Sequence, residues 1–473
     1  MKTKTTRTPS AGPGRVLRAV VLAAAASLAA GVPAAQAADR FMLRALPDDL
    51  PAVLARHGLD LVGPLGDAVG ELYLVESSGA MPPEQLEEIV EDDPQVIDFE
   101  VVEPAEVPDE DDDLGASSGL LLDALGDRTL IDYYGATAWV GYVEQPALER
   151  IGVPEVRSLA TGQGAVVAII DTGVDPDHPL LAGRLVPGYD FLADQPGPAS
   201  EWTGIDQDAA AALQQSVAWI LDGVGVAELH QSVAWILDQS VAWILDQYEL
   251  PPAFGHGTMV AGAVRLVAPE ASIMPLRAFD AHGRAETSDI VRAIYHAVDH
   301  GADVINMSFS VPSFSEEILR AVNYANRQGV VCVAAAGNSG RDVLVYPAAL
   351  GNSIGVASTD DADQRSAFSN FGDDLVTVAA PGEGIVTAFP GGGAYAGGWG
   401  TSYSTALVSG AAALLVELGA RSDGTPGVAY HRVVEALSHA EAVPGRLGYG
   451  RLDVLEALEA LAGEAEEGEE EED

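Results

Sequence analysis

The sequence is short of two residue classes, cysteine and basic residues. Its 473 residues include one cysteine, Cys332, so no disulfide can form within the chain. Cys332 lies in the apolar run VVCVAAAG, and we interpret it as a small core residue rather than a nucleophile. Lys and Arg total 24 against 71 Asp and Glu, which gives a net charge of -47. Nucleic acid is therefore not an expected partner, because phosphate binding needs clustered Lys and Arg.

The N-terminus has the pattern of an export signal. Basic residues precede an apolar stretch at residues 19–32, and the triplet Ala35-Gln36-Ala37 follows as an A-x-A cleavage site. The apolar stretch is too short to cross a bilayer comfortably, so no stable membrane anchor is expected. We expect residues 1–37 to be a signal peptide and the mature chain to be secreted, with the periplasm or the cell surface as alternatives.

Three further segments differ from one another in composition. Residues 38–102 combine strand patterns such as ELYLVES with the helical pattern PPEQLEEIVEDD, and they predict a small α+β unit of ferredoxin-like type. Residues 103–128 are acidic and rich in Pro, Gly and Ser, and we expect a solvated linker open to proteolytic processing. The acidic tail, residues 463–473, is expected to be disordered.

The largest segment, residues 129–462, alternates short apolar runs with helical patterns. AVVAIID, DVINMSF and VVCVAAAG are rich in β-branched residues and carry no charge at their centres. Such runs are typical of a parallel sheet with helices on both faces, so the predicted fold class is three-layer α/β.

Three short motifs in this region carry residues of chemical interest. Asp171 ends a buried strand in AIIDTG, His256 lies between glycines in GHGT, and Ser402 opens an apolar helix in GTSYSTA. Each has an ordinary structural explanation by itself: a turn cap, a hydrogen-bonding core histidine and a helix N-cap. Their appearance together favours a shared site at the carboxyl ends of the strands.

Together these motifs resemble those of the subtilisin-like serine proteases. DTG, HGT and GTS occur in the Asp, His, Ser order of that family, and AAAGNSG matches its oxyanion-hole segment, which implies that role for Asn338. The resemblance implies a secreted serine endopeptidase that acts on proteins or peptides. It also implies that residues 38–102 are an inhibitory propeptide of an autoprocessed precursor.

The implied chemistry suits these residue types. Ser402 becomes a nucleophile when His256 accepts its proton, and Asp171 orients the imidazole and stabilises its charged form. The Asn338 amide and the Ser402 backbone N–H can donate to the oxyanion. Catalysis needs no cofactor or metal. Structural calcium stays unassigned, because Asp190 and Asp194 alone are a weak signal and a solvated loop is the simpler interpretation.

The resemblance also implies two substrate-binding segments that depart from the family pattern. Ser310 stands where glycine is customary, and Arg284-Ala285-Glu286 replaces a Gly/Ser-rich stretch. Outside these segments, Ala406 replaces the family's proline four residues after Ser402. Phe309 is equally well explained by core packing. The expected substrate-binding residues are Gly283, Arg284, Ala285, Met307, Ser308, Phe309 and Ser310.

Residues 196–250 contain the octapeptide QSVAWILD three times, starting at Gln215, Gln231 and Gln239. We expect a surface insertion beside the site, explained by tandem duplication or by an apolar exosite. Two other functional classes stay open at this point. One is a catalytically silent binding protein that uses the cleft, and the other is a membrane-surface protein that uses this apolar loop.

Overall fold

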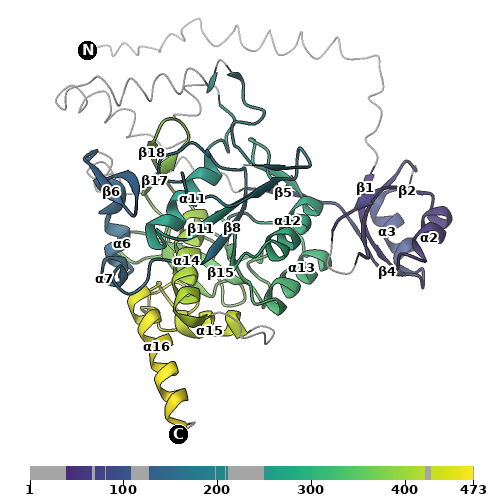
Figure 1. Ribbon diagram of the computed structural model, residues 1–473. Helices are drawn as coiled ribbons and strands as arrows, with labels where there is room; N and C mark the ends of the chain where they lie inside the picture. The colour runs from purple at the N-terminus through teal and green to yellow at the C-terminus, as the bar shows by residue number, and fades with distance from the viewer. Residues whose placement is uncertain are drawn as a thin grey trace, which may run out of the picture.

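The computed structural model of the protein describes residues 39–66, 70–79, 81–107, 127–197, 199–207, 209–210, 250–420 and 428–471. The expected signal peptide and the three octapeptide copies lie outside these residues. The described chain forms a small N-terminal unit beside a larger α/β unit (Figure 1).

The N-terminal unit is an antiparallel sheet with two helices. Its elements are β1 (Asp39–Ala45), α2 (Leu50–His57), β2 (Leu59–Pro64), β3 (Leu72–Ser77), α3 (Pro83–Glu91) and β4 (Val96–Val101). The strand order is β2-β3-β1-β4, which is the βαββαβ arrangement of the expected ferredoxin-like type. The stacked rings of Phe41 and Phe99, with centroids 4.8 Å apart, lie in a core that belongs to this unit alone.

An eight-stranded sheet forms the centre of the larger unit. Its strands are β8 (Val166–Asp171), β9 (Gly188–Asp190), β10 (Gln195–Gly197), β11 (Ser272–Arg277), β13 (Val304–Met307), β14 (Val331–Ala335), β15 (Ile354–Thr359) and β16 (Val378–Pro381). The order is β10-β9-β11-β8-β13-β14-β15-β16, and every neighbouring pair is parallel except β10 and β9. This sheet confirms the predicted α/β class.

Helices cover both faces of the sheet, which explains why its strands are apolar throughout. The helices are α11 (His256–Val267) and α14 (Thr401–Leu415) on one face, and α12 (Thr287–Asp299) and α13 (Glu316–Arg327) on the other. Val167 of β8 lies in the core cluster with α11 and α14, and its neighbour Ala168 lies in the cluster with α12 and α13. Cys332 is fully buried in the second cluster, and burial raises the pKa of its thiol to about 12, so its core interpretation is confirmed.

The remaining elements complete the described chain. They are β5 (Pro104–Glu106), β6 (Leu130–Tyr133), β7 (Ala136–Trp139), α5 (Val140–Val143), α6 (Pro146–Arg150), α7 (Val153–Val156), β12 (Arg284–Glu286), β17 (Ile385–Phe389), β18 (Ala394–Gly398), the π-helix η1 (Val416–Ala420), α15 (Val428–Leu437) and α16 (Val454–Glu471). Among the described helices, the run Thr401–Gly419 is apolar and long enough to cross a membrane by composition, but most of it is buried in the core of the larger unit.

Three expectations from the sequence are wrong at their boundaries. The linker expected from residue 103 begins with β5, which pairs with β12 and is therefore held in place. The insertion expected from residue 196 begins with packed chain, since Ser200 forms a parallel bridge with Val174 and Leu250 is buried at the other end. The tail expected to be disordered continues α16 to Glu471, because glutamate favours helix and the preceding turns are already formed.

Helices α11 and α14 approach each other closely at Gly410. A Cβ at this position would lie 2.7 Å from the Cβ of Val267 and 2.9 Å from the carbonyl oxygen of Val264. Only glycine lets the two helices meet without displacement. The first residue of α11 and the second residue of α14 are two of the predicted site residues, so this contact also sets the distance between them.

We therefore expect Gly410→Ala to destabilise the fold by about 1–3 kcal/mol, because the helices must separate. Denaturant unfolding, monitored by fluorescence in a Ser402→Ala background, measures the change. Gly351→Ala is the matched control, since no heavy atom lies within 4 Å of its added Cβ; its effect should stay within about 0.5 kcal/mol. Equal stability of the two variants would contradict the close-contact explanation.

Candidate active site

Asp171 and His256 meet at the carboxyl end of β8. Asp171 is the last residue of that strand, and His256 is the first residue of α11. The Nδ1 atom of His256 lies 2.8 and 3.0 Å from the two carboxylate oxygens of Asp171. Because an ionised carboxylate only accepts hydrogen bonds, Nδ1 carries the proton, and Nε2 is the basic nitrogen of the ring.

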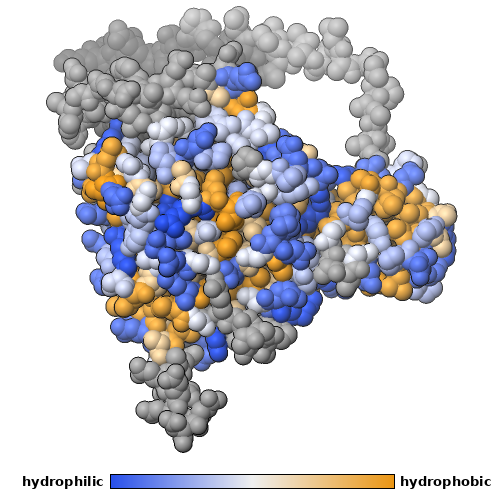
Figure 2. Space-filling model, in the orientation of Figure 1, coloured by the Kyte–Doolittle hydropathy of each residue, from blue (hydrophilic) through white to orange (hydrophobic). Residues whose placement is uncertain are grey.

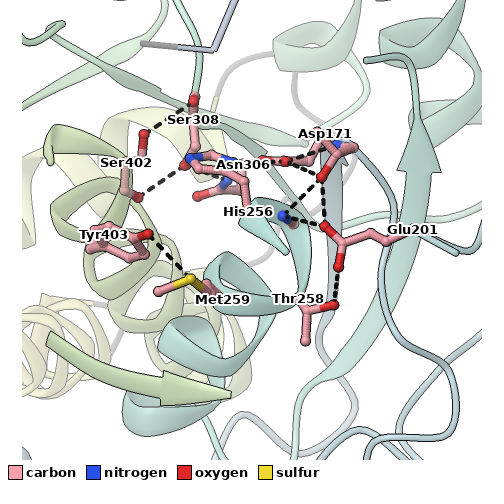
Figure 3. Close-up of polar contacts among 11 residues, drawn as sticks. Asp171, Glu201, His256, Thr258, Met259, Asn306, Ser308, Ser402 and Tyr403 are labelled. Atoms are coloured by element: carbon pink, nitrogen blue, oxygen red, sulfur yellow. Dashed lines mark hydrogen bonds and ion pairs between the residues drawn. The ribbon is translucent and has the colours of Figure 1, made fainter. Parts of the chain in front are cut away.

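Ser402 lies on the other side of the imidazole. It is the second residue of α14, and its hydroxyl donates to the carbonyl oxygen of Ser308 at 3.2 Å. Ser308 in turn donates its own hydroxyl to the carbonyl oxygen of Ser402 at 2.9 Å, which ties the end of β13 to the first turn of α14. Figure 3 shows the imidazole of His256 between the carboxylate of Asp171 and the side chain of Ser402.

Glycine in the DTG and HGT motifs permits this close arrangement. A Cβ at Gly257 would lie 2.0 Å from the carbonyl oxygen of Gly173, and a Cβ at Gly173 would lie 2.3 Å from the carbonyl oxygen of Ala199. Gly173 also has a φ of 107°, which L side chains rarely adopt. Gly257 therefore lets the start of α11 touch the turn after β8, and Gly173 lets the backbone at Ala199 touch the same turn.

Asn338 is held next to the start of α14. Its side-chain oxygen accepts hydrogen bonds from the N–H of Thr401 at 3.0 Å and from the Thr401 hydroxyl at 2.8 Å. With the oxygen engaged, the amide nitrogen is left as a donor beside Gly400, where an added Cβ would lie 3.1 Å from it. This donor and the N-terminus of α14 form a place where a negative oxygen is stabilised.

The predicted substrate-binding segments enclose an extended piece of the chain itself. β5 pairs antiparallel with β12, with Ala105 opposite Ala285, and Val107 N–H donates to the Gly283 carbonyl at 2.8 Å. On the other side, Ser310 N–H approaches the carbonyl oxygen of Glu106 at 3.4 Å. The two segments therefore act as the walls of a groove that takes a β-strand.

The side chains of the second segment are less open than the resemblance suggested. Met307 and Phe309 are fully buried in a core cluster that also contains Ala105. The ring centroid of Phe309 lies 4.9 Å from that of Phe279, so core packing accounts for Phe309. Arg284 points its side chain outward and is 60% exposed.

Sequence reasoning missed Glu201, which lies beside Asp171 and His256. Its carboxylate accepts hydrogen bonds from the Thr172 hydroxyl at 2.6 Å, from Gly257 N–H at 2.9 Å and from the Thr258 hydroxyl (Figure 3). Burial raises the pKa of Glu201 to about 7; the two threonine hydroxyls oppose the rise and the charge of Asp171 adds to it. No motif marks Glu201 in the sequence, because it stands 30 residues after Asp171 in the stretch assigned to the insertion.

The two carboxylates considered for calcium have other partners. Asp190 is buried and forms an ion pair with Arg277 at 3.0 Å, and Asp194 forms one with Arg292. The solvated loop expected there is therefore wrong for Asp190, whose charge is compensated inside the protein. Within the described ranges, no group of three or more His, Cys, Asp or Glu residues could hold a metal ion.

Comparison with known proteins gives a consistent set of relatives. A sequence model described as the subtilase family matches residues 162–450. Thermitase from Thermoactinomyces vulgaris is 35% identical over 271 residues, which cover 57% of this chain and 81% of thermitase. A thermophilic serine proteinase from Bacillus sp. strain AK1 is 32% identical over 295 residues, which cover 62% of this chain and 61% of that protein.

Among solved structures, fervidolysin from Fervidobacterium pennivorans, a keratinolytic enzyme related to subtilisin, matches with a TM-score of 0.65. The match covers 89% of this chain and 61% of fervidolysin at 21% sequence identity, so it shows that the fold is shared.

The Asp171–His256 contact predicts a spectroscopic signature. A proton held between Nδ1 and a buried carboxylate should give a ¹H resonance far downfield of the backbone amides. We expect Asp171→Asn to remove or strongly shift this resonance, since an amide oxygen is a weaker acceptor. Asp303→Asn is the control, because Asp303 accepts from Val166 N–H at the opposite end of β8 and should leave the signal in place. A signal unchanged in Asp171→Asn would contradict the pairing.

Proposed function

The chain belongs to the subtilase family of serine proteases, and from that premise we propose that it is a secreted serine endopeptidase made as an autoprocessed precursor. The observation that carries the proposal is the row of carboxylate, imidazole and hydroxyl at Asp171, His256 and Ser402, beside the amide of Asn338. The signal-peptide pattern of residues 1–37 supports secretion.

In the proposed reaction, the Ser402 oxygen attacks the carbonyl carbon of a peptide bond while its proton passes to Nε2 of His256. The carbonyl oxygen becomes an anion that accepts from the Asn338 amide and from Ser402 N–H. The intermediate collapses when the imidazolium protonates the leaving amine, and an acyl-enzyme remains. Water then adds to the acyl carbon with His256 as base, and release of the carboxylic acid restores the Ser402 hydroxyl.

The proposed substrate is an extended protein or peptide strand. The antiparallel pairing of β5 with β12, together with the approach of Ser310, supports this, because a substrate backbone would make the same contacts. Gly283, Ala285 and Ser310 are the proposed backbone partners, and the exposed guanidinium of Arg284 borders the groove.

The N-terminal unit, residues 38–102, is proposed as the propeptide. Its Arg44 forms a buried bidentate ion pair with Glu317 of α13, at 2.8 and 2.6 Å. Its Glu100 accepts from the Ser315 hydroxyl at 2.6 Å and from Glu316 N–H at 3.1 Å, so a carboxylate sits at the start of α13. Figure 2 shows hydrophilic residues where the two units meet. Since residues 104–107 fill the groove, processing belongs after Val107, within residues 103–128.

A catalytically silent binding protein is less well supported, because all four groups of the reaction lie in one site. Labelling by a fluorophosphonate tests the difference. The processed protein should react at Ser402, and Ser402→Ala should not react. Ser404→Ala, two residues along α14 with its hydroxyl bonded to the Ala380 carbonyl, is the matched control and should still be labelled. Absence of labelling in the unchanged processed protein would reject the enzyme.

The contact between the propeptide and α13 also predicts a pH dependence of inhibition. Burial raises the pKa of Glu100 to about 7 and the pKa of Asp98 to about 6, with neighbouring carboxylates adding to both. The charged groups that face them are Glu316, Glu317, Arg320 and Arg44. A carboxyl whose pKa is higher in the bound state favours binding at low pH, and this contribution is lost between its ordinary pKa and its bound-state pKa.

We therefore expect inhibition of peptide hydrolysis by the retained N-terminal unit to weaken by about tenfold or more from pH 5 to pH 8. Activity before and after removal of that unit measures the inhibited fraction at each pH. Glu100→Gln keeps an acceptor for Ser315 but cannot ionise, so its profile should be flatter. Glu88→Gln changes an exposed carboxylate of α3 and should follow the unchanged protein. Stronger inhibition at higher pH would contradict the expected direction of the pH dependence.

A further inference from the structure

Glu201 is delivered to the site by a short stretch of backbone that follows β10. Val174 N–H donates to the Ala199 carbonyl at 2.9 Å, and Glu201 N–H donates to the Val174 carbonyl at 3.0 Å. The stretch is therefore held against the turn that follows Asp171. Glu201 itself is buried, with 2% of its surface exposed.

The carboxylate of Glu201 connects two pieces of chain that each carry a site residue. Thr172 follows Asp171 and donates its hydroxyl to Oε1; Gly257 follows His256 and donates its N–H to the same oxygen. Thr258, one residue further along α11, donates its hydroxyl to Oε2. The Thr258 hydroxyl also accepts a hydrogen bond from Asp175 N–H at 2.7 Å, so its own proton is directed to Oε2 of Glu201.

Burying an ionised carboxylate costs free energy, and neutral hydrogen-bond donors offset that cost less than a basic partner does. A carboxylate is therefore an unfavourable group for a purely structural link. A second carboxylate, Asp171, lies close enough to add to its electrostatic cost, and the pKa of Glu201 is raised to about 7. Its charge therefore changes near neutral pH, next to the imidazole. Buried ionisable groups that destabilise the fold are found mainly at functional sites, where their position or charge is needed for function.

We propose, on the basis of the proposed protease function, that Glu201 is a positioning residue: its ionised carboxylate ties the turn after Asp171 to the first turn of α11 and so holds the imidazole of His256 in line with Ser402. In the ionised form both oxygens accept, and all three links are made. A proton on the carboxyl group weakens one of the two oxygens as an acceptor, and the link to Thr258 or to Thr172 and Gly257 loosens.

This role predicts a kinetic effect that is confined to the chemical step. Glu201→Ala removes all three links, and we expect kcat to fall by about ten- to a hundredfold with KM changed by less than about threefold, because misplacement of the imidazole affects the reaction rather than the groove. Glu201→Gln retains an acceptor for Thr172 and Gly257 but presents an amide N–H to the Thr258 hydroxyl. It should lose less of kcat than Glu201→Ala.

The pH profile separates positioning from a merely structural role. In the unchanged processed enzyme, the acid limb of kcat/KM should reflect two deprotonations, one at the His256–Asp171 pair and one at Glu201. In Glu201→Gln the second deprotonation is absent, so the acid limb of kcat/KM should become less steep and fit a single deprotonation. The measurement uses a short uncharged peptide substrate between pH 5 and pH 9.

Glu270→Gln is the matched control, because Glu270 also accepts a threonine hydroxyl, that of Thr161 at 2.8 Å, at the opposite end of the sheet. It should change neither kcat nor the steepness of the limb. Equal kcat and an unchanged limb in Glu201→Gln would overturn the proposal, as would a loss expressed mainly in KM. If Glu201→Ala does not fold, Glu201→Gln decides the outcome alone. Fluorophosphonate labelling of the unchanged enzyme separates failure of this inference from failure of the protease function, because it reports whether Ser402 reacts at all and involves no substitution at Glu201.

Discussion

The site depends on one close backbone contact, in which the start of α11 touches the turn that follows β8. Gly257 and the Gly173 carbonyl meet where any side chain would collide, and this contact brings His256 within hydrogen-bond distance of Asp171. α14 then approaches α11 through Gly410, which sets the position of Ser402. Because each contact involves backbone or a packed helix, the three groups are held by the rigid part of the fold rather than by mobile loops.

Buried charge is the second feature that organises the molecule. Asp171 is hydrogen-bonded to an imidazole, Asp190 is ion-paired with Arg277 and Glu317 with Arg44, so each of these three buried carboxylates has a basic partner. Glu201 differs, because its bonds come from two hydroxyls and a backbone N–H. Because the pKa of Glu201 is raised to about 7, its side chain can change charge near neutral pH, whereas an amide or an apolar side chain at that position could not.

The groove and the interface with the N-terminal unit form one continuous surface. β12 pairs with β5, and Arg40 of the N-terminal unit forms an ion pair with Glu286 at the end of the same strand. Occupancy of the groove is therefore coupled to docking of the N-terminal sheet on α12 and α13 (Figure 1). The pairing of β12 with the protein's own chain is the observation on which the proposed binding of an extended substrate rests.

The sequence by itself determined the α/β class, because apolar strand and helix patterns are local. The antiparallel α+β unit before it was also readable, since strand and helix periodicities are local. The resemblance of its motifs to those of the subtilisin-like proteases predicted the roles of Asp171, His256, Asn338 and Ser402. Only the tertiary structure decided the burial and hydrogen-bond donors of Glu201, the partners of Asp190 and Asp194, the burial of Phe309 and the pairing of β5. These depend on which side chains meet across long stretches of chain, and a buried carboxylate looks like an exposed one until its donors are known. The acidic composition around β5 wrongly predicted a solvated linker, because the hydrogen bonds that hold β5 come from β12, which lies far along the chain.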